Sequence, residues 1–150
     1  MTEKQSNPKD LVGTRKAPRS TVSAVVMAEV GVAMLEGALK YGRHNYRAVG
    51  VRASVYYDAT MRHLDAWWDM GQDLDQDSGM HHVTKAIAGL MVLRDAMIND
   101  LCEDDRPPSV AEFYAELNAK AAALVEKYGE RNPRHYTIAD TRPTEGAGHG

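Results

Sequence analysis

The chain contains few of the features that mark secreted or membrane-spanning proteins. Cys102 is the only cysteine in 150 residues, so no disulfide can form within the chain, and a disulfide-stapled secreted fold is excluded. No 18-residue uncharged apolar run is present, so we expect no transmembrane helix and no membrane partner. The polar N-terminus, MTEKQSNPKDLVG, contains no signal-peptide core. These absences predict a cytoplasmic protein.

Other absences narrow the function. The formal net charge is −3, which gives no general signature of nucleic-acid binding. The sequence lacks a Cys-x-x-Cys pair, a GxxxxGK phosphate loop, a GxSxG elbow and a helical HExxH motif. Zinc hydrolases, P-loop enzymes and serine hydrolases therefore lose support. With 43% hydrophobic residues, the chain is long enough to fold as one domain with a sizeable core.

The residues that are present predict an all-α fold. Apolar residues recur at helical spacing in four segments, and no period-two run is long enough to indicate a sheet. The expected helices cover 21–41, 54 to about 71, 77 or 78 to about 101, and 109 to about 128. Ser54 is the expected N-cap of the second, Ser109 and Glu112 form a capping box, and Gly42 suits a helix C-terminus. We predict an irregular N-terminal arm (1–19), a four-helix-bundle-like domain (20–129) and a mobile C-terminal tail (130–150).

Helical spacing also predicts the core. On the first helix the expected core positions are Val26, Val30, Ala33, Met34 and Leu35. On the third they are Val83, Ile87, Leu90 and Met97. Leu64 and Trp67 are assigned to the core from the second helix. Trp68 is assigned to the surface, with stacking on a planar ligand as the alternative.

The stretch from Arg62 to His82, RHLDAWWDMGQDLDQDSGMHH, is the most informative part of the sequence. It holds five aspartates, three histidines and two tryptophans. Carboxylates at this density repel one another unless a cation neutralises them, and hard cations such as Mg²⁺ prefer oxygen ligands. The alternative is a solvated acidic loop. The match of this loop to an EF-hand fails, because Ser78 stands in place of the turn glycine and Thr84 in place of the bidentate glutamate.

Carboxylates and bases elsewhere extend this candidate site. Glu36 lies midway along an apolar helix, where an inward carboxylate is a known way to build a metal site in a bundle. Asp58, Arg62, Asp65 and Asp69 share one face of the second helix, which could also be a solvent face of ion pairs. His82, beside Asp75 and Asp77, is a candidate metal ligand. Phosphate contacts are expected from a group of basic and polar residues: Lys40, Arg43, His44, Asn45, Arg47, Arg52 and Arg62. The alternative is that they form a basic surface loop.

Five blocks of this sequence resemble a known family. They are NPKD at 7–10, LEGALKYGRHNYR at 35–47, GVRASVYYDA at 50–59, the acidic stretch at 62–82 and DDRPP at 104–108. Together they resemble the N-terminal domain of phage-type dATP/dGTP diphosphohydrolases, a group similar to the MazG-like all-α nucleoside triphosphate pyrophosphohydrolases. The resemblance covers residues 7–108.

The resemblance implies hydrolysis of a purine deoxynucleoside triphosphate (dNTP) to the monophosphate and pyrophosphate, with Mg²⁺ or Mn²⁺, in the cytoplasm of an infected host. It implies a homo-oligomer, a dimer or a tetramer. The predicted catalytic residues are Glu36, His63 and Asp75. The predicted metal ligands are Glu36, Asp58, Asp75, Asp77 and His82. The predicted substrate-binding residues are Lys40, Tyr41, Asn45, Arg52, Arg62 and Trp68.

Two positions depart from the family pattern. Many relatives have glutamate where this chain has Gln72, and tryptophan where it has Tyr46. Loss of a carboxylate at position 72 would weaken a metal site unless Asp69 or Asp73 replaces it. Two alternatives to the enzyme therefore stay open: a catalytically weak module that binds nucleotide or metal, and a structural helical oligomer.

Overall fold

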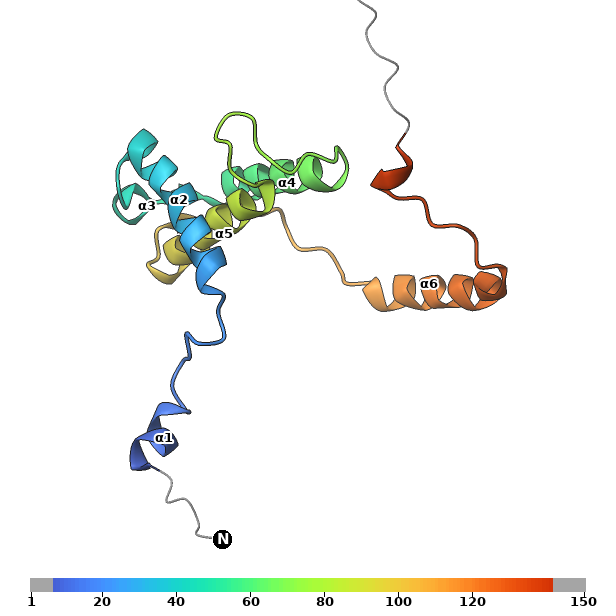
Figure 1. Cartoon of the computed structure of the whole chain (residues 1–150), viewed down its shortest axis with the longest axis horizontal. Coiled ribbons are helices and arrows are strands. Elements are labelled where there is room, and N and C mark those ends of the chain that lie inside the picture. Colours follow the sequence, from blue (N-terminus) through green and yellow to red (C-terminus); the bar gives the residue numbers. More distant parts are fainter. Residues whose placement is uncertain (1–6, 142–150) are drawn as a thin grey trace, which may run out of the picture. The chain divides into compact units, whose positions relative to one another are not determined.

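The computed structural model describes residues 7–141 and divides into two units, Met1–Asp105 and Arg106–Gly150. The first unit contains α1 (Pro8–Gly13), α2 (Ala24–Tyr41), α3 (Asn45–Ala48), β1 (Val51–Arg52), α4 (Ala53–Trp68), α5 (His82–Ile98) and β2 (Cys102–Glu103) (Figure 1). The second contains α6 (Tyr114–Tyr128) and 3₁₀ turns at Gly129–Arg131 and Ile138–Asp140. The predicted predominance of helix is confirmed. Within residues 7–141, no helix is long and apolar enough to cross a membrane.

Helix α5 is the centre of the first unit. Both α4 and α2 pack against it, and they make little contact with each other. Val30, Ala33 and Ala88 form the buried core, with Met34, Met80 and Ile87 packed around them. Small residues dominate where the helices approach closely; Ala86 and Ala96 of α5 are almost completely buried. Because α2 and α4 share only α5, a space remains between them.

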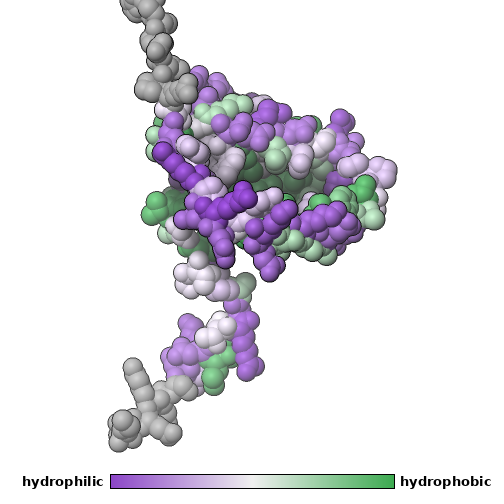
Figure 2. Space-filling view, turned by 90° about the vertical axis from the view of Figure 1, so that its right-hand side faces the viewer, coloured by the Kyte–Doolittle hydropathy of each residue, from purple (hydrophilic) through white to green (hydrophobic). Residues whose placement is uncertain are grey.

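The predicted core positions are only partly correct. Val30 and Ala33 are buried, but Leu90 and Met97 are 49% and 40% exposed. The physical reason is that α5 is contacted on two sides, and alanines occupy those contacts instead of the larger side chains. Trp67, also predicted to be core, is 37% exposed. Figure 2 shows hydrophobic residues (green) open to the surface among hydrophilic ones (purple).

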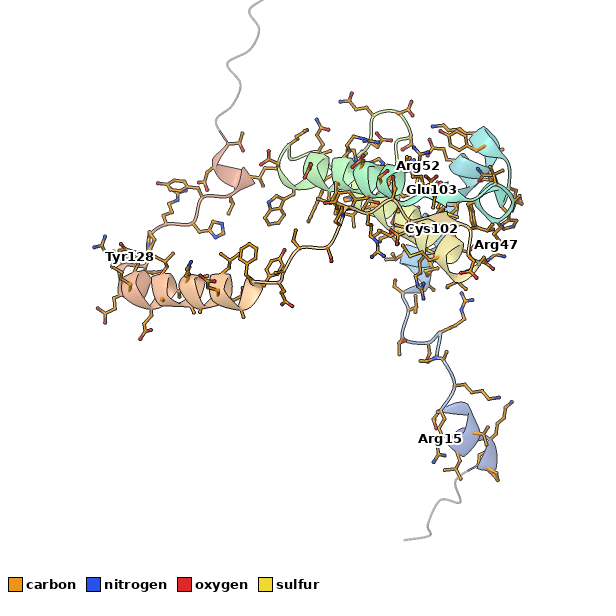
Figure 3. All side chains as sticks on the ribbon, turned by 180° about the vertical axis from the view of Figure 1, so that it is seen from behind. Arg15, Arg47, Arg52, Cys102, Glu103 and Tyr128 are labelled. Atoms are coloured by element: carbon orange, nitrogen blue, oxygen red, sulfur yellow. The ribbon has the colours of Figure 1, made fainter. Side chains whose placement is uncertain are left out.

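A small parallel sheet, absent from the sequence prediction, holds the start of α4. Val51 pairs with Cys102, and Arg52 pairs with Glu103. The side chains of Arg52 and Glu103 also form an ion pair, in which Nε lies 3.2 Å from Oε2 (Figure 3). The strands are too short to show a period-two pattern.

The strand pairing brings Asp105 to the N-terminus of α4. Ser54, predicted to be the N-cap itself, lies one residue inside the helix, and its backbone N–H donates to Asp105 Oδ1 at 2.8 Å. The side-chain hydrogen bond from Ser54 lowers the pKa of Asp105. A depressed carboxyl pKa stabilises the fold above about pH 4, and that contribution is lost as the pH falls through the folded-state pKa.

The acidic loop between α4 and α5 is held by its own hydrogen bonds. The Asp75 backbone N–H donates to Met80 O at 2.8 Å, and His82 N–H donates to Asp73 O at 2.9 Å. The Ser78 hydroxyl donates to Asp75 Oδ2 at 2.6 Å, which lowers the pKa of Asp75. These bonds make a turn of residues 75–80, so α5 begins at His82 and not at the predicted Asp77 or Ser78.

The predicted ends of the chain also differ from the structure. Residues 8–13, within the predicted irregular arm, form α1, whose N-terminus is capped by the Asn7 side chain. The predicted capping box at Ser109 and Glu112 does not form, and α6 begins at Tyr114 without a side-chain cap. Residues 109–113 are exposed, so no packing stabilises the extra helical turn that the capping box would begin. Residues 1–6 of the arm and 142–150 of the tail lie outside the described part of the chain.

Candidate functional site

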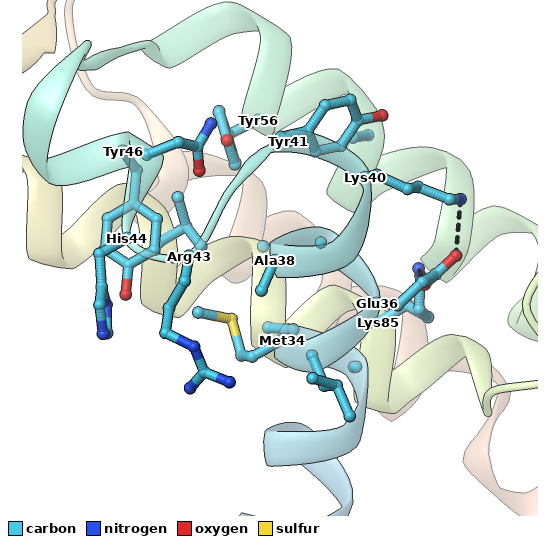
Figure 4. Close-up of a pocket in the computed structure, with 18 of the residues that line it drawn as sticks. Met34, Glu36, Ala38, Lys40, Tyr41, Arg43, His44, Tyr46, Tyr56 and Lys85 are labelled. Atoms are coloured by element: carbon cyan, nitrogen blue, oxygen red, sulfur yellow. Dashed lines mark hydrogen bonds and ion pairs between the residues drawn. The ribbon is translucent and has the colours of Figure 1, made fainter.

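A cavity of about 360 Å³ occupies the space between α2 and α4, with α5 as its floor (Figure 4). The C-terminal half of α2, the loop 42–44 and the start of α3 form one wall, and one face of α4 forms the other. Residues with small side chains lie on its helical surfaces: Gly37, Ala38, Ala59, Ala88 and Gly89. The cavity size is within the range of small-molecule and cofactor sites. We call it the α2–α4 pocket.

One end of the pocket is ionic. Glu36 Oε1 lies 2.6 Å from Lys40 Nζ, and its other carboxylate oxygen bonds to Lys85 Nζ. Lys40 and Lys85 both lower the pKa of Glu36, Lys40 having the larger effect, and Glu36 raises the pKa of Lys40. Asp77 Oδ2, in the acidic loop, lies 3.3 Å from Lys40 Nζ. The site therefore holds two ammonium groups, both bound to Glu36, with Asp77 as a second carboxylate beside Lys40.

A pair of histidines adjoins this ionic end. His63, on α4, lines the pocket, and its Nδ1 lies 2.9 Å from Nδ1 of His82, on α5. One of these two nitrogens must carry a proton and donate the hydrogen bond, and the other must accept it without a proton of its own. Burial lowers the pKa of His63, with the charge of Asp75 acting in the opposite direction. His82 is only 5% exposed, and its Nε2 has no hydrogen-bond partner among the described residues.

The other end of the pocket is aromatic. It is formed by Tyr56 of α4, Val92 of α5, His44, and the first two residues of α3, Asn45 and Tyr46. Figure 4 shows Tyr46 and Tyr56 at this end and Lys40 with Glu36 at the opposite end. Burial raises the pKa of the Tyr56 phenol. Stacking and apolar contact are therefore the chemistry available at this end.

The position of the aromatic end is fixed by an ion pair outside the pocket. Arg47 of α3 binds Asp95 of α5 through Nε and Nη2, at 2.8 and 2.6 Å. This two-point contact raises the pKa of Arg47 and lowers that of Asp95. Because a guanidinium fork binds a carboxylate in a defined orientation, it holds Tyr46, the residue before Arg47, beside the C-terminal half of α5.

The acidic side chains do not form a ready metal site. Within residues 7–141, no group of three or more histidine, cysteine, aspartate or glutamate residues is close enough to hold an ion. Both oxygens of Glu36 are bound to lysines, and Asp75 accepts hydrogen bonds from Ser78. Asp73 and Asp77 are 76% and 82% exposed in their side chains. A metal ion therefore does not fit these residues as they stand, and most of the acidic loop is solvated.

The predicted site residues fall into three groups. Glu36, Lys40, Tyr41, Asn45 and His63 line the pocket. Asp75, Asp77 and His82 do not line it but interact with residues that do. Asp58, Arg62 and Trp68 are exposed on α4, and Arg52 pairs with Glu103 on the small sheet; none of these four lines the pocket.

Several residues that line the pocket were not predicted from the sequence, among them Tyr56, Thr60 and Lys85. A usable signal exists, because Tyr56 and Thr60 precede His63 by seven and three residues and so share its helix face. Lys85 follows His82 by three residues, but its pairing with Glu36 depends on how α5 packs against α2. Thr60 is 5% exposed, and its hydroxyl has no hydrogen-bond partner in the described part of the chain.

Comparisons with known proteins agree with the sequence resemblance. Residues 6–106 match the family model "dATP/dGTP diphosphohydrolase, N-terminal". A curated Salmonella phage PMBT28 protein named dATP/dGTP diphosphohydrolase is 33% identical over 96 residues. That alignment covers 64% of this chain and 32% of the relative, so the chain spans about a third of the relative's length. No solved structure matches the chain.

Proposed function

Because the chain belongs to the dATP/dGTP diphosphohydrolase N-terminal family, we propose that it hydrolyses dATP or dGTP to the deoxynucleoside monophosphate and pyrophosphate. The structural observation that supports this most is the α2–α4 pocket, with two lysines at one end and tyrosines at the other. A nucleotide has a part that suits each end: an anionic triphosphate for the lysines and a flat aromatic base for the tyrosines. The proposed role is control of a phage purine nucleotide pool.

In the proposed reaction, a water oxygen bonds to the α-phosphorus and the bond from that phosphorus to the α–β bridging oxygen breaks. Pyrophosphate leaves with the bond's electron pair. Lys40 and Lys85 are placed to move from Glu36 to the phosphates and to balance the charge on the leaving group. Glu36, once released from the lysines, is free to accept the proton of the attacking water. His63 borders the same end of the pocket and is the second group that could take this proton.

We also propose that the reaction requires Mg²⁺ or Mn²⁺. A divalent cation would neutralise the triphosphate and polarise the phosphoryl group. Since the described residues hold no ready site, we propose that the ion arrives bound to the nucleotide. We also propose a homo-oligomer, dimer or tetramer, which size-exclusion chromatography tests.

The direct test is to incubate the protein with each of the four dNTPs, with Mg²⁺, with Mn²⁺ and with EDTA, and to separate the products by ion exchange. We expect purine dNTPs to give the monophosphate and pyrophosphate in equal amounts. EDTA should stop the reaction and added cation should restore it. Release of orthophosphate, or turnover that is unaffected by EDTA, would contradict the proposal.

A second candidate function is a nucleotide-binding module without significant turnover. The observation that favours it is the lack of a ready metal site among the described residues. Under this alternative, purine dNTPs raise the melting temperature of the protein but no pyrophosphate appears. The product assay and a thermal melt with the same nucleotides therefore separate the two functions.

A further inference from the structure

Helices α4 and α5, which form one wall and the floor of the α2–α4 pocket, determine the order in which ionic and aromatic side chains lie along it. α4 and α5 run antiparallel, because Thr60 of α4 adjoins Gly89, and His63, further along α4, faces His82 at the start of α5. At 1.5 Å rise per residue, Tyr56 and His63 lie about 10 Å apart along the axis of α4. The pocket therefore has an ionic end, a middle and an aromatic end, in that order.

The middle of the pocket is defined by a close approach of α4 to α5. A Cβ atom on Gly89 would lie only 3.3 Å from Thr60 Oγ1. Ala59 and Ala88 adjoin this point and are also pocket residues. Side chains this small leave room for a group that is neither highly charged nor aromatic.

The distribution of charge gives the pocket a direction. At the ionic end, Lys40 and Lys85 both bind Glu36, Lys40 also lies 3.3 Å from Asp77 Oδ2, and Lys85 is only 19% exposed in its side chain. At the aromatic end, Arg43 is exposed, and Tyr56 and Val92 are half-buried or buried. A triphosphate at this end would take the place of Glu36 on the two lysines, and the charge of Lys85 is less screened by water than that of the exposed Arg43.

We propose that the purine base lies at the aromatic end with one face against Tyr56, the sugar lies over Gly89, and the triphosphate lies at the ionic end. This inference rests on the proposed function and adds the orientation of the substrate and a base-binding residue. Tyr56 suits this role because its ring combines an aromatic face with a partly buried position in the pocket wall. Stacking tolerates either purine, so Tyr56 contributes affinity for the base without separating dATP from dGTP.

The test compares a probe that contains a nucleoside with one that is a triphosphate alone. Calorimetry measures the Kd of inorganic tripolyphosphate and of a non-hydrolysable α,β-imido dGTP, both with Mg²⁺. The variants are Tyr56→Ala, Tyr56→Leu and Tyr57→Ala. Tyr57 is the matched control, because it is the next residue on α4, is 61% exposed and does not line the pocket.

For Tyr56→Ala we expect the Kd of the dGTP analogue to rise about tenfold or more, the range of a lost base–aromatic stack, with the Kd of tripolyphosphate unchanged. Tyr56→Leu keeps apolar bulk at this position, so it tests the ring if the alanine variant does not fold. Tyr57→Ala should change neither Kd. Equal effects on both probes, or no effect of either Tyr56 variant, would overturn the inference. If pyrophosphate release is normal in that case, the proposed function stands and only the orientation is wrong.

Discussion

Replacing Glu36 with glutamine is expected to lower kcat for purine dNTP hydrolysis by about 100-fold or more, the scale of a lost proton acceptor. The KM should stay the same or fall. In the structure Glu36 occupies both Lys40 and Lys85. Its negative charge sits where the triphosphate is proposed to bind, so it opposes ground-state binding. Removing that charge frees the lysines for phosphate but removes a group needed for the reaction.

The split between kcat and KM distinguishes this role from a structural one. A variant that was merely misfolded would lose bound nucleotide as well as turnover. Glu29→Gln is the matched control, because Glu29 lies two turns earlier on α2 and does not line the pocket. It should keep the wild-type kcat. Steady-state kinetics with dATP and dGTP, together with a thermal melt of each variant, measure these effects. A fully active Glu36→Gln would remove Glu36 from the proposed reaction.

Replacing Gly50 with alanine is expected to cost about 3 kcal/mol or more of unfolding free energy, the combined scale of left-handed backbone strain and a steric clash. Gly50 has φ +82°, and a Cβ atom there would lie 2.5 Å from the Leu101 carbonyl oxygen. That oxygen accepts the hydrogen bond of Val51 N–H at 2.9 Å, next to the first pair of the parallel strands. The clash therefore pushes β1 away from β2, and with it Asp105 from the start of α4.

Gly79→Ala is the control for this prediction. Gly79 has a similar φ of +69°, but a Cβ atom there meets nothing within 4 Å. It should lose only about 1 kcal/mol, from the left-handed conformation alone. Urea denaturation of both variants measures the difference. Equal losses would show that the contact between Gly50 and Leu101 is unimportant for stability.

The sequence predicts helices well where the signals are local. The first expected helix, 21–41, becomes α2 at Ala24–Tyr41, and Gly42 ends it with φ +96° as expected for a glycine at a helix C-terminus. Signals that depend on tertiary contacts are missed. The parallel sheet joins residues about 50 positions apart through strands of two residues, and Asp105 reaches α4 only because those strands pair.

The candidate site shows the same division. Glu36, Lys40 and His63 were predicted as site residues and lie together at one end of the pocket. The acidic stretch was predicted to converge on a cation, and its aspartates are instead spread over a helix face and a turn. Composition shows how many carboxylates a segment has. Their directions depend on the turn made by Asp75 and Ser78, which the residue pattern did not predict.

A crystal structure of the protein with α,β-imido dGTP and Mg²⁺ tests most directly whether the α2–α4 pocket binds the substrate. We expect the triphosphate between Lys40 and Lys85, the sugar over Gly89 and the base against Tyr56. Nucleotide bound outside the α2–α4 pocket, or bound there with its phosphates at the aromatic end, would contradict this expectation.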